Sequence, residues 1–268
     1  MIVHGRDEIL ALARGANIVA LVDANGWHVD AWRLNEAEVD ASISLYAAVL
    51  SGGATDPVAA LLAESGLDLE ALLLDEEQSK DEITRSDLTE LIAAASMVAL
   101  PECDTDKMLM PNVPKMSRRK SDSGIDIFVA DIREDASDDS DLYDDEYLTI
   151  ASVKHTIDDS TSGMRWKLAE SLSRKELGAA YLISQLRVLN SNLQQSGLGR
   201  GPAARVYLFI RDFPHPERID LYAIGVASPA LESDLAHHVQ LLPDAGRSRR
   251  TFRMIFVPGL KTVHERCP

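Results

Sequence analysis

Cysteines and long apolar runs are scarce in this sequence, and each scarcity argues against a class of protein. The two cysteines, Cys103 and Cys267, are far apart and form no C-x-x-C pair, which argues against a disulfide framework or a structural zinc site. No segment approaches the roughly 18 consecutive apolar residues that cross a bilayer. The first residues, MIVHGRDEIL, lack the pattern of a signal peptide. The expected protein is therefore cytoplasmic and has no membrane partner.

Basic residues are also scarce, but only in the first part of the chain. Residues 1–110 contain 21 acidic and 6 basic residues, whereas residues 111–268 contain 22 acidic and 21 basic ones. In the second part, the segment Asp131 to Glu146 alone holds 9 acidic residues and Arg133. The rest of that part is therefore basic. Since nucleic-acid binding requires basic surface, it is compatible with the second part and not with the first.

The first third is predicted to be an acidic, mainly helical region. Its apolar residues recur at three- and four-residue spacing, except around Asn25-Gly26, which is typical of the turn between two strands. The charged segment DEEQSKDE then predicts a boundary between a region 1–80 and a domain 81–268. The helices expected in the first region are Arg6 to Arg14, Glu36 to Leu50, Pro57 to Glu64 and Leu67 to Leu74.

The remaining chain alternates between helical and strand patterns, which predicts a mixed α/β fold. The expected helices are Thr84 to Leu100 with Ser86 as N-cap, Met164 to Leu172, and a longer helix that begins at Ser173 with Glu176 and stops at Gly197. The expected strands are Gly124 to Ala130, Tyr147 to Thr156, Ala204 to Ile210 (ARVYLFI) and Ile219 to Ala227.

Polar side chains interrupt two apolar segments that are predicted to be neighbouring strands. Asp126 stands in GIDIFVA, and Ser152 and Lys154 stand in YLTIASVKHT. Side chains two residues apart in a strand point to the same face, so Ser152 and Lys154 are expected to point the same way. A carboxylate beside a lysine in a core is either an internal ion pair, which is a poor stabiliser because both charges lose water, or part of a metal site.

These residues, with Glu90 in RSDLTEL, resemble the motif of the PD-(D/E)xK nuclease superfamily. That motif has a helix with a glutamate, a strand with an aspartate, and a second strand with a carboxylate, any residue and a lysine. The resemblance implies a restriction-endonuclease-like mixed sheet flanked by helices, and a metal-dependent deoxyribonuclease. In such an enzyme Mg²⁺ or Mn²⁺ polarises the phosphate and activates a water, which the lysine orients or deprotonates. Asp126, Lys154 and Glu90 match the aspartate, the lysine and the helix glutamate.

The chain departs from this pattern at Ser152, where the motif has its second carboxylate. Some type II restriction enzymes have Ser-Val-Lys here and supply the missing glutamate from the following helix. Glu170, sixteen residues after Lys154, is the corresponding candidate. The resemblance therefore implies that Asp126 and Glu170 are the metal ligands, that Lys154 is the catalytic lysine, and that Ser152 and Glu90 assist from further out.

Simpler interpretations stay open for several of these residues. Glu170 lies four residues before Arg174, so an exposed helical ion pair would also explain it, and Glu90 would fit a solvated helix face. DNA contact is expected from basic residues that flank the site, for which a solubilising surface is the alternative. These residues are Lys115, Arg118, Arg119, Lys120, Arg165, Lys167 and Arg187.

The order of GID, SVKHT, KLAESLS and YLISQLR is similar to that in the nuclease subunit of the Hachiman antiphage defence system, over roughly residues 82–268. This resemblance implies an effector nuclease that a superfamily 2 helicase partner restrains. The acidic first third would repel DNA, so it is expected to dock a protein or to cover the nuclease groove. Deletion of residues 1–80 is then expected to abolish partner binding and to leave the rest folded.

Two alternatives remain beside the defence nuclease. One is a stand-alone, type II-like restriction endonuclease, which would cut plasmid DNA into discrete fragments without a partner. The other is a catalytically inactive nuclease fold that acts as a binding or regulatory module, which Ser152 favours. A Mg²⁺-dependent cleavage assay with substitutions at Asp126, Lys154 and Glu170 separates these hypotheses.

Overall fold

One mixed β-sheet organises the part of the chain that the structure describes. The computed structural model describes residues 6–21, 23–52, 77–99, 108–109, 126–132, 141–156, 183, 186–187, 190, 200–211, 218–240, 242 and 250–267. In these residues seven strands form a single sheet in the order β1-β2-β7-β6-β5-β4-β3. The predicted mixed α/β class is confirmed.

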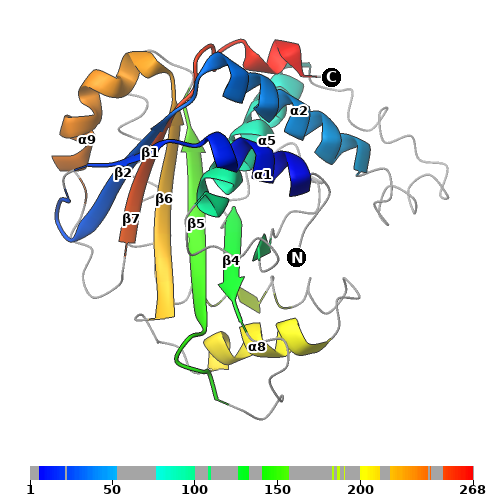
Figure 1. Cartoon of the computed structure of the whole chain (residues 1–268), viewed down its shortest axis with the longest axis vertical. Helices are drawn as coiled ribbons and strands as arrows, with labels where there is room; N and C mark the ends of the chain where they lie inside the picture. The colour runs from blue at the N-terminus through cyan, green and yellow to red at the C-terminus, as the bar shows by residue number, and fades with distance from the viewer. Residues whose placement is uncertain are drawn as a thin grey trace.

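The sheet has a parallel centre and antiparallel edges. β2, β7, β6 and β5 run parallel to one another, whereas β1, β4 and β3 join through antiparallel pairs (Figure 1). The strands are β1 (Ile18–Ala20), β2 (Trp27–Arg33), β3 (Met108–Leu109), β4 (Ile127–Asp131), β5 (Tyr147–His155), β6 (Ile219–Ala227) and β7 (Arg250–Phe256). The predicted strands Tyr147 to Thr156 and Ile219 to Ala227 correspond closely to β5 and β6.

The turn between β1 and β2 follows the sequence signal at Asn25-Gly26. Asn25 has a φ of 52° and Gly26 a φ of 80°, which is the left-handed backbone that both central residues of a type I′ turn require. Ala24 and Trp27 pair across this turn. The predicted strand pair is therefore confirmed.

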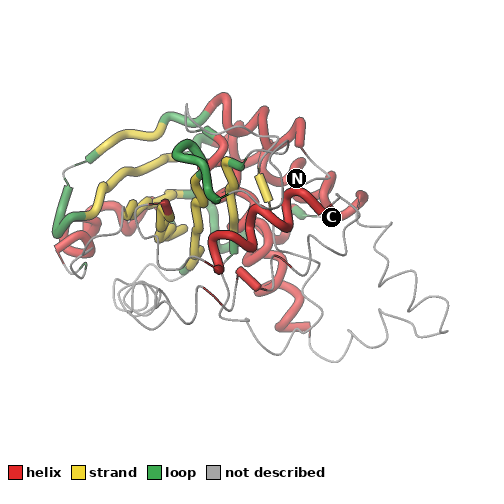
Figure 2. The backbone as a smooth tube through the Cα atoms, turned by 90° about the horizontal axis from the view of Figure 1, so that it is seen from below, coloured by secondary structure: helices red, strands yellow, loops and turns green. Residues whose placement is uncertain are grey.

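Helices cover both faces of the sheet. The helical elements are α1 (Arg6–Gly15), α2 (Glu36–Gly52), α5 (Glu77–Val98), α8 (Arg200–Arg211), the 3₁₀ segment η4 (Pro229–Asp234), α9 (Leu235–Gln240) and the 3₁₀ segment η5 (Val263–Arg266). α1, α2 and α5 share one core with Trp32, Val153, Ile224 and Ile255. η4 and α9 share another core with Val29, Ala223 and Phe252, which lie on the opposite face. In Figure 2 the yellow strands form a layer with red helices on either side. In the described residues, no helix combines the length and the apolar character that crossing a membrane requires.

A capping box fixes the corner between β2 and α2. The side chain of Asn35 accepts a hydrogen bond from the backbone N–H of Glu38, and the carboxylate of Glu38 accepts one from the backbone N–H of Asn35, at 3.0 and 2.7 Å. Trp32 Nε1 also donates to Glu38 at 3.3 Å. Three polar contacts thus set the direction in which the chain leaves the sheet.

The structure does not divide the chain at the predicted boundary of residues 80 and 81. β2, from the first third, pairs in parallel with β7 over seven residues, and α5 begins at Glu77 and runs across the boundary. α1 and α2 pack with α5 in one core. Ser86 therefore lies inside a helix, and the prediction that it is an N-cap is wrong. The first third is part of the same folded unit because a strand from it completes the sheet.

Two other predictions differ from the structure. The segment ARVYLFI belongs to the helix α8, not to a strand, and β7 was not predicted. Arg205, Val206 and Phe209 are buried, whereas Tyr207 and Arg211 are exposed, which is a helical repeat. The helices predicted at 57–64, 67–74 and 164–172 lie outside the described residues. Of the helix predicted after Ser173, residues 183, 186, 187 and 190 are described and helical.

Candidate functional site

The start of β4 lies beside the second half of β5. Ile127 pairs with Ala151 in the antiparallel register. The N–H of Asp126 also donates to the carbonyl of Ala151, at 3.0 Å. Asp126 and Ile127 therefore both face Ala151, as the two residues of a β-bulge face one residue of the neighbouring strand. The N–H of Val153 donates to Oδ2 of Asp126 at 2.6 Å. The Asp126 carboxylate is therefore held against the edge of β5 by the backbone.

Ser152 and Lys154 lie on either side of that contact along β5. Ala151 and Val153 belong to the core under α5, so the alternation of the strand directs Ser152 and Lys154 to the opposite face. Ser152 is 9% exposed and Lys154 is half-buried. Lys154 forms no ion pair with any other residue that the structure describes. An internal Asp126–Lys154 salt bridge, the simpler interpretation of these residues, is thus not found.

Glu90 lies on the other side of β5. It is 5% exposed on α5, and the hydroxyl of Ser86 donates to its Oε1 at 3.2 Å. Because α5 covers the face that carries Val153, Glu90 and Lys154 are on opposite faces of the strand. The alternative that Glu90 belongs to a solvated helix face is wrong, since its side chain is buried. The structure brings Asp126 to the Ser152–Lys154 segment, but it does not bring Glu90 to Lys154.

Most of the other predicted site residues lie outside the described residues. These are Glu170, Lys115, Arg118, Arg119, Lys120, Arg165 and Lys167. Arg187 is described, is helical and is exposed, which suits either a DNA contact or a solubilising role. The second carboxylate and the basic flank of the site therefore stay predictions from the sequence.

The oxygen atoms of Asp126 and Ser152, where β4 pairs with β5, suit a hard cation. Asp126 offers carboxylate oxygen and Ser152 a hydroxyl, and Mg²⁺ prefers oxygen ligands and often takes one or two carboxylates together with water and phosphate. Within the described ranges, no three Asp, Glu, His or Cys side chains come together as a metal-binding group. Asp126 is thus the one carboxylate that the described residues bring to the Ser152–Lys154 segment.

Sequence reasoning missed a buried polar cluster on the α5 face of the sheet. Arg253 of β7 bonds Asp30 of β2 through two hydrogen bonds of 2.7 Å, and it donates to the carbonyl of Ser96 on α5 at 2.6 Å. Burial raises the pKa of the neighbouring Tyr222, while a hydrogen bond with Thr251 lowers it. Asp30 in a predicted strand was the available signal, since a charged residue in a buried strand requires a partner.

A second buried ion pair joins α8 to the acidic segment before β5. Arg205 bonds Glu146 with both charges buried to 1% exposure, and Arg205 Nε lies 2.8 Å from Glu146 Oε1. Arg205 also stacks over the ring of Tyr143, at 5.2 Å from the ring centroid. Glu146 is thus buried, although the segment Asp131 to Glu146 in which it stands is strongly acidic.

No known family model matches this chain. A comparison with curated proteins likewise gives no significant match.

Proposed function

We propose that the chain is a metal-dependent DNA endonuclease of the PD-(D/E)xK type. The observation that carries the proposal is the Asp126 carboxylate, which accepts a hydrogen bond from Val153, the residue between Ser152 and Lys154. A carboxylate just before one strand and a lysine on its antiparallel neighbour are the elements that this chemistry requires for a metal and a nucleophilic water.

The order of elements around the hairpin also supports the proposal. α5 with Glu90 comes first, then the antiparallel strands β3, β4 and β5, then helical residues, and then β6 parallel to β5. Asp126 precedes the middle strand of the three, and Lys154 lies near the end of the third. This is the helix, aspartate strand, lysine strand order of the motif that the sequence resembles.

Each residue has a defined task in the proposed reaction. Asp126 and Glu170 would hold Mg²⁺ or Mn²⁺, which supplies Lewis-acid polarisation of the phosphate and a more acidic bound water. Lys154 would orient or deprotonate that water. Ser152 provides a hydroxyl beside the ligands. Glu90 is on the opposite face of β5, so we assign it no contact with the metal.

The partners proposed for the enzyme follow from the same resemblance. The basic residues around the site, including Arg187, would contact DNA phosphates, which gives affinity with little sequence preference. A helicase partner would restrain the nuclease until foreign or damaged DNA is met, as in an antiphage defence system. The stand-alone restriction enzyme is distinguished by cleavage into discrete fragments without any partner.

The test is cleavage of plasmid DNA by the purified chain, alone and with its partner, in the presence of Mg²⁺ or of EDTA. Asp126→Asn keeps an oxygen that can accept the hydrogen bond of Val153 but loses the charge, and Lys154→Met keeps the length of the side chain. Each change is expected to reduce cleavage by a factor of about 100 or more, as for loss of a catalytic group. Lys261→Met, on an exposed residue, is the matched control. Unchanged cleavage in both site variants would contradict the proposal.

Ser152 favours one second candidate, an inactive nuclease fold that serves as a binding module. A serine is a neutral and weaker ligand than the carboxylate that the motif places there. In that case the wild-type chain would cleave nothing with Mg²⁺ or Mn²⁺, even with its partner, and would still bind DNA. Loss of DNA binding in Arg187→Glu, without any cleavage by the wild type, would favour the module.

A further inference from the structure

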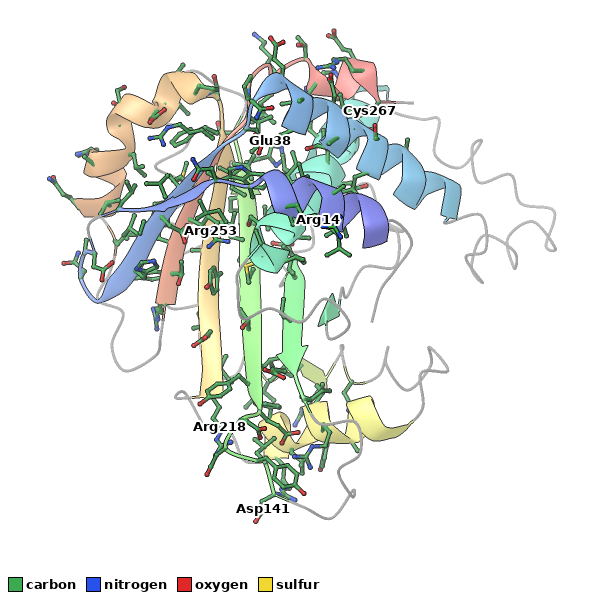
Figure 3. All side chains as sticks on the ribbon, in the orientation of Figure 1. Arg14, Glu38, Asp141, Arg218, Arg253 and Cys267 are labelled. Atoms are coloured by element: carbon green, nitrogen blue, oxygen red, sulfur yellow. The ribbon has the colours of Figure 1, made fainter. Side chains whose placement is uncertain are left out.

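Exposed tyrosines gather where β5 begins. Four large hydrophobic side chains are at least 36% exposed in the described part of the chain, and three are Tyr143, Tyr147 and Tyr207. Tyr143 and Tyr147 flank the start of β5, and Tyr207 lies on α8, one turn before Arg211, which bonds Asp141. We call these tyrosines, with the carboxylates of Asp141, Asp144 and Asp145, the tip surface. Figure 3 shows Asp141 and Arg218 at this lower end of the molecule, away from α1 and α2.

The backbone under the tip surface is held rigidly. Glu146 accepts a hydrogen bond from the N–H of Tyr143 at 2.8 Å, and its own N–H donates to the carbonyl of Tyr143 at 3.1 Å. Arg218 also donates to the carbonyl of Tyr143, and Arg205 forms a buried ion pair with Glu146. A buried ion pair is a poor source of stability, so its effect here is to fix one conformation of the loop. A surface that is ordered in advance loses less conformational entropy when it binds a partner.

The charge of the tip surface selects the kind of partner. The side chains of Asp141 and Asp144 are almost fully exposed although each bonds an arginine, and Asp145 is also exposed. Carboxylates at the surface repel phosphates but attract lysine and arginine, and tyrosine rings bind the same cations through their faces. Tyrosine is also enriched at the centres of protein interfaces.

We propose that the tip surface docks a partner protein through a basic patch on that partner. The proposal does not depend on the nuclease activity. Val153, which holds Asp126, lies six residues after Tyr147 along β5, a separation of about 20 Å. The tip surface is therefore a place on the molecule separate from the candidate site. The docking surface is on the β5–α8 end, not on the acidic first third.

The experiment places a photo-crosslinking residue, p-benzoylphenylalanine, at Tyr207 in the full chain and irradiates the source cells. The matched control places it at Val19, which is 40% exposed on β1 at the far edge of the sheet. We expect position 207 to crosslink to another protein, within a peptide of net positive charge identified by mass spectrometry, at a yield about tenfold above position 19.

A charge reversal then tests the electrostatic part. Asp144→Lys in the crosslinking chain is expected to reduce the yield by a factor of about ten, whereas Asp23→Lys, an exposed change on the β1–β2 turn, leaves it unchanged. Urea unfolding of both variants checks that the fold is retained. Crosslinks to nucleic acid, to a second copy of this chain or to an acidic peptide would overturn the proposal, as would equal yields from both positions or none from position 207.

Discussion

At the scale of single residues, the candidate site depends on a backbone contact. Val153 donates its N–H to Asp126, the residue just before β4 begins, so the carboxylate takes the place that a further strand residue would otherwise occupy. This contact satisfies a backbone donor and also fixes the position of the acid. Ser152 and Lys154 stand on either side of Val153 in the sequence, and both lie on the face of β5 that points away from α5. A substitution at Ser152 therefore changes the surroundings of Lys154 and of Asp126.

Replacing Ser152 by glutamate restores the carboxylate that the motif has two residues before its lysine. We expect Ser152→Glu to stay folded, to retain cleavage and to bind Mn²⁺ about tenfold more tightly than the wild type, because a charged ligand joins Asp126. Isothermal titration calorimetry measures the affinity. Thr149→Glu adds the same charge to β5 on the face of Val153, and it should leave Mn²⁺ binding unchanged. Equal affinities in Ser152→Glu and the wild type would argue against a metal at this hairpin.

Tyr222 provides a residue-level prediction for alkaline pH. Desolvation raises its pKa above the ordinary value of about 10, because the buried phenolate is disfavoured. A raised pKa in the folded state means that the stability contribution is fully present below pH 10 and is lost as the pH rises through the folded-state pKa. In Tyr222→Phe, the free energy of unfolding in urea should therefore fall less steeply above pH 10. Identical slopes in Tyr222→Phe and the wild type would contradict this assignment.

At the scale of elements, α8 is held to the start of β5 by one buried charge pair. Arg205 and Glu146 are each 1% exposed, and Arg205 also bonds the carbonyl of Asp141. Taking both ions out of water is costly, and the pair offsets that cost only while both partners are present. The contact therefore makes the position of α8 sensitive to either residue.

Removal of one partner from this pair is expected to be strongly destabilising. Glu146→Leu leaves a buried arginine without its carboxylate and should lower the free energy of unfolding by about 3 kcal/mol or more, measured in urea. The double variant Glu146→Leu with Arg205→Met should lose less than Glu146→Leu alone, since no buried charge is left unpaired. Asp144→Ala, which breaks an exposed ion pair with Arg218 at 3.0 Å, should cost less than about 1 kcal/mol. A similar loss in Asp144→Ala would show that burial does not set the effect.

The elements differ in how well the sequence predicted them, and the reasons are physical. β5 and β6 were predicted because apolar, β-branched runs of strand length leave few alternatives. The segment ARVYLFI has the same composition, yet it forms part of α8, since Arg205 finds its carboxylate from a helix and Tyr207 stays in solvent. β7 was not predicted because Arg250 and Arg253 interrupt its apolar sequence. Arg253 is nevertheless buried in the strand, since it is paired with Asp30. Within the site, motif spacing pointed to Asp126 and Lys154, whereas the separation of Glu90 from Lys154 depends on which face α5 covers.

At the scale of the whole molecule, the acidic first third is a structural part of the sheet. β2 lies between β1 and β7, and its Asp30 neutralises Arg253, which in turn bonds the carbonyl of Ser96 near the end of α5. Carbonyls in the last turn of a helix have no partner within the helix, so Arg253 also caps α5. The acidic composition of the first third predicted a separable docking region. Composition could not show that one of its strands, β2, pairs with β7 inside the sheet.

Deletion of the first third is therefore expected to unfold the chain, contrary to the expectation from composition. Without residues 1–80, β7 becomes an exposed edge, Arg253 is left without Asp30, and α5 loses its contacts with α1 and α2. The shortened chain should show no cooperative unfolding in urea and rapid proteolysis. Asp30→Leu should reproduce part of this loss, about 3 kcal/mol, and Asp30→Leu with Arg253→Met should recover some of it. Asp40→Leu breaks an exposed pair with Arg266 and should change little. A stable, protease-resistant fragment 81–268 would instead mean that the first third only docks on a domain that is complete without it.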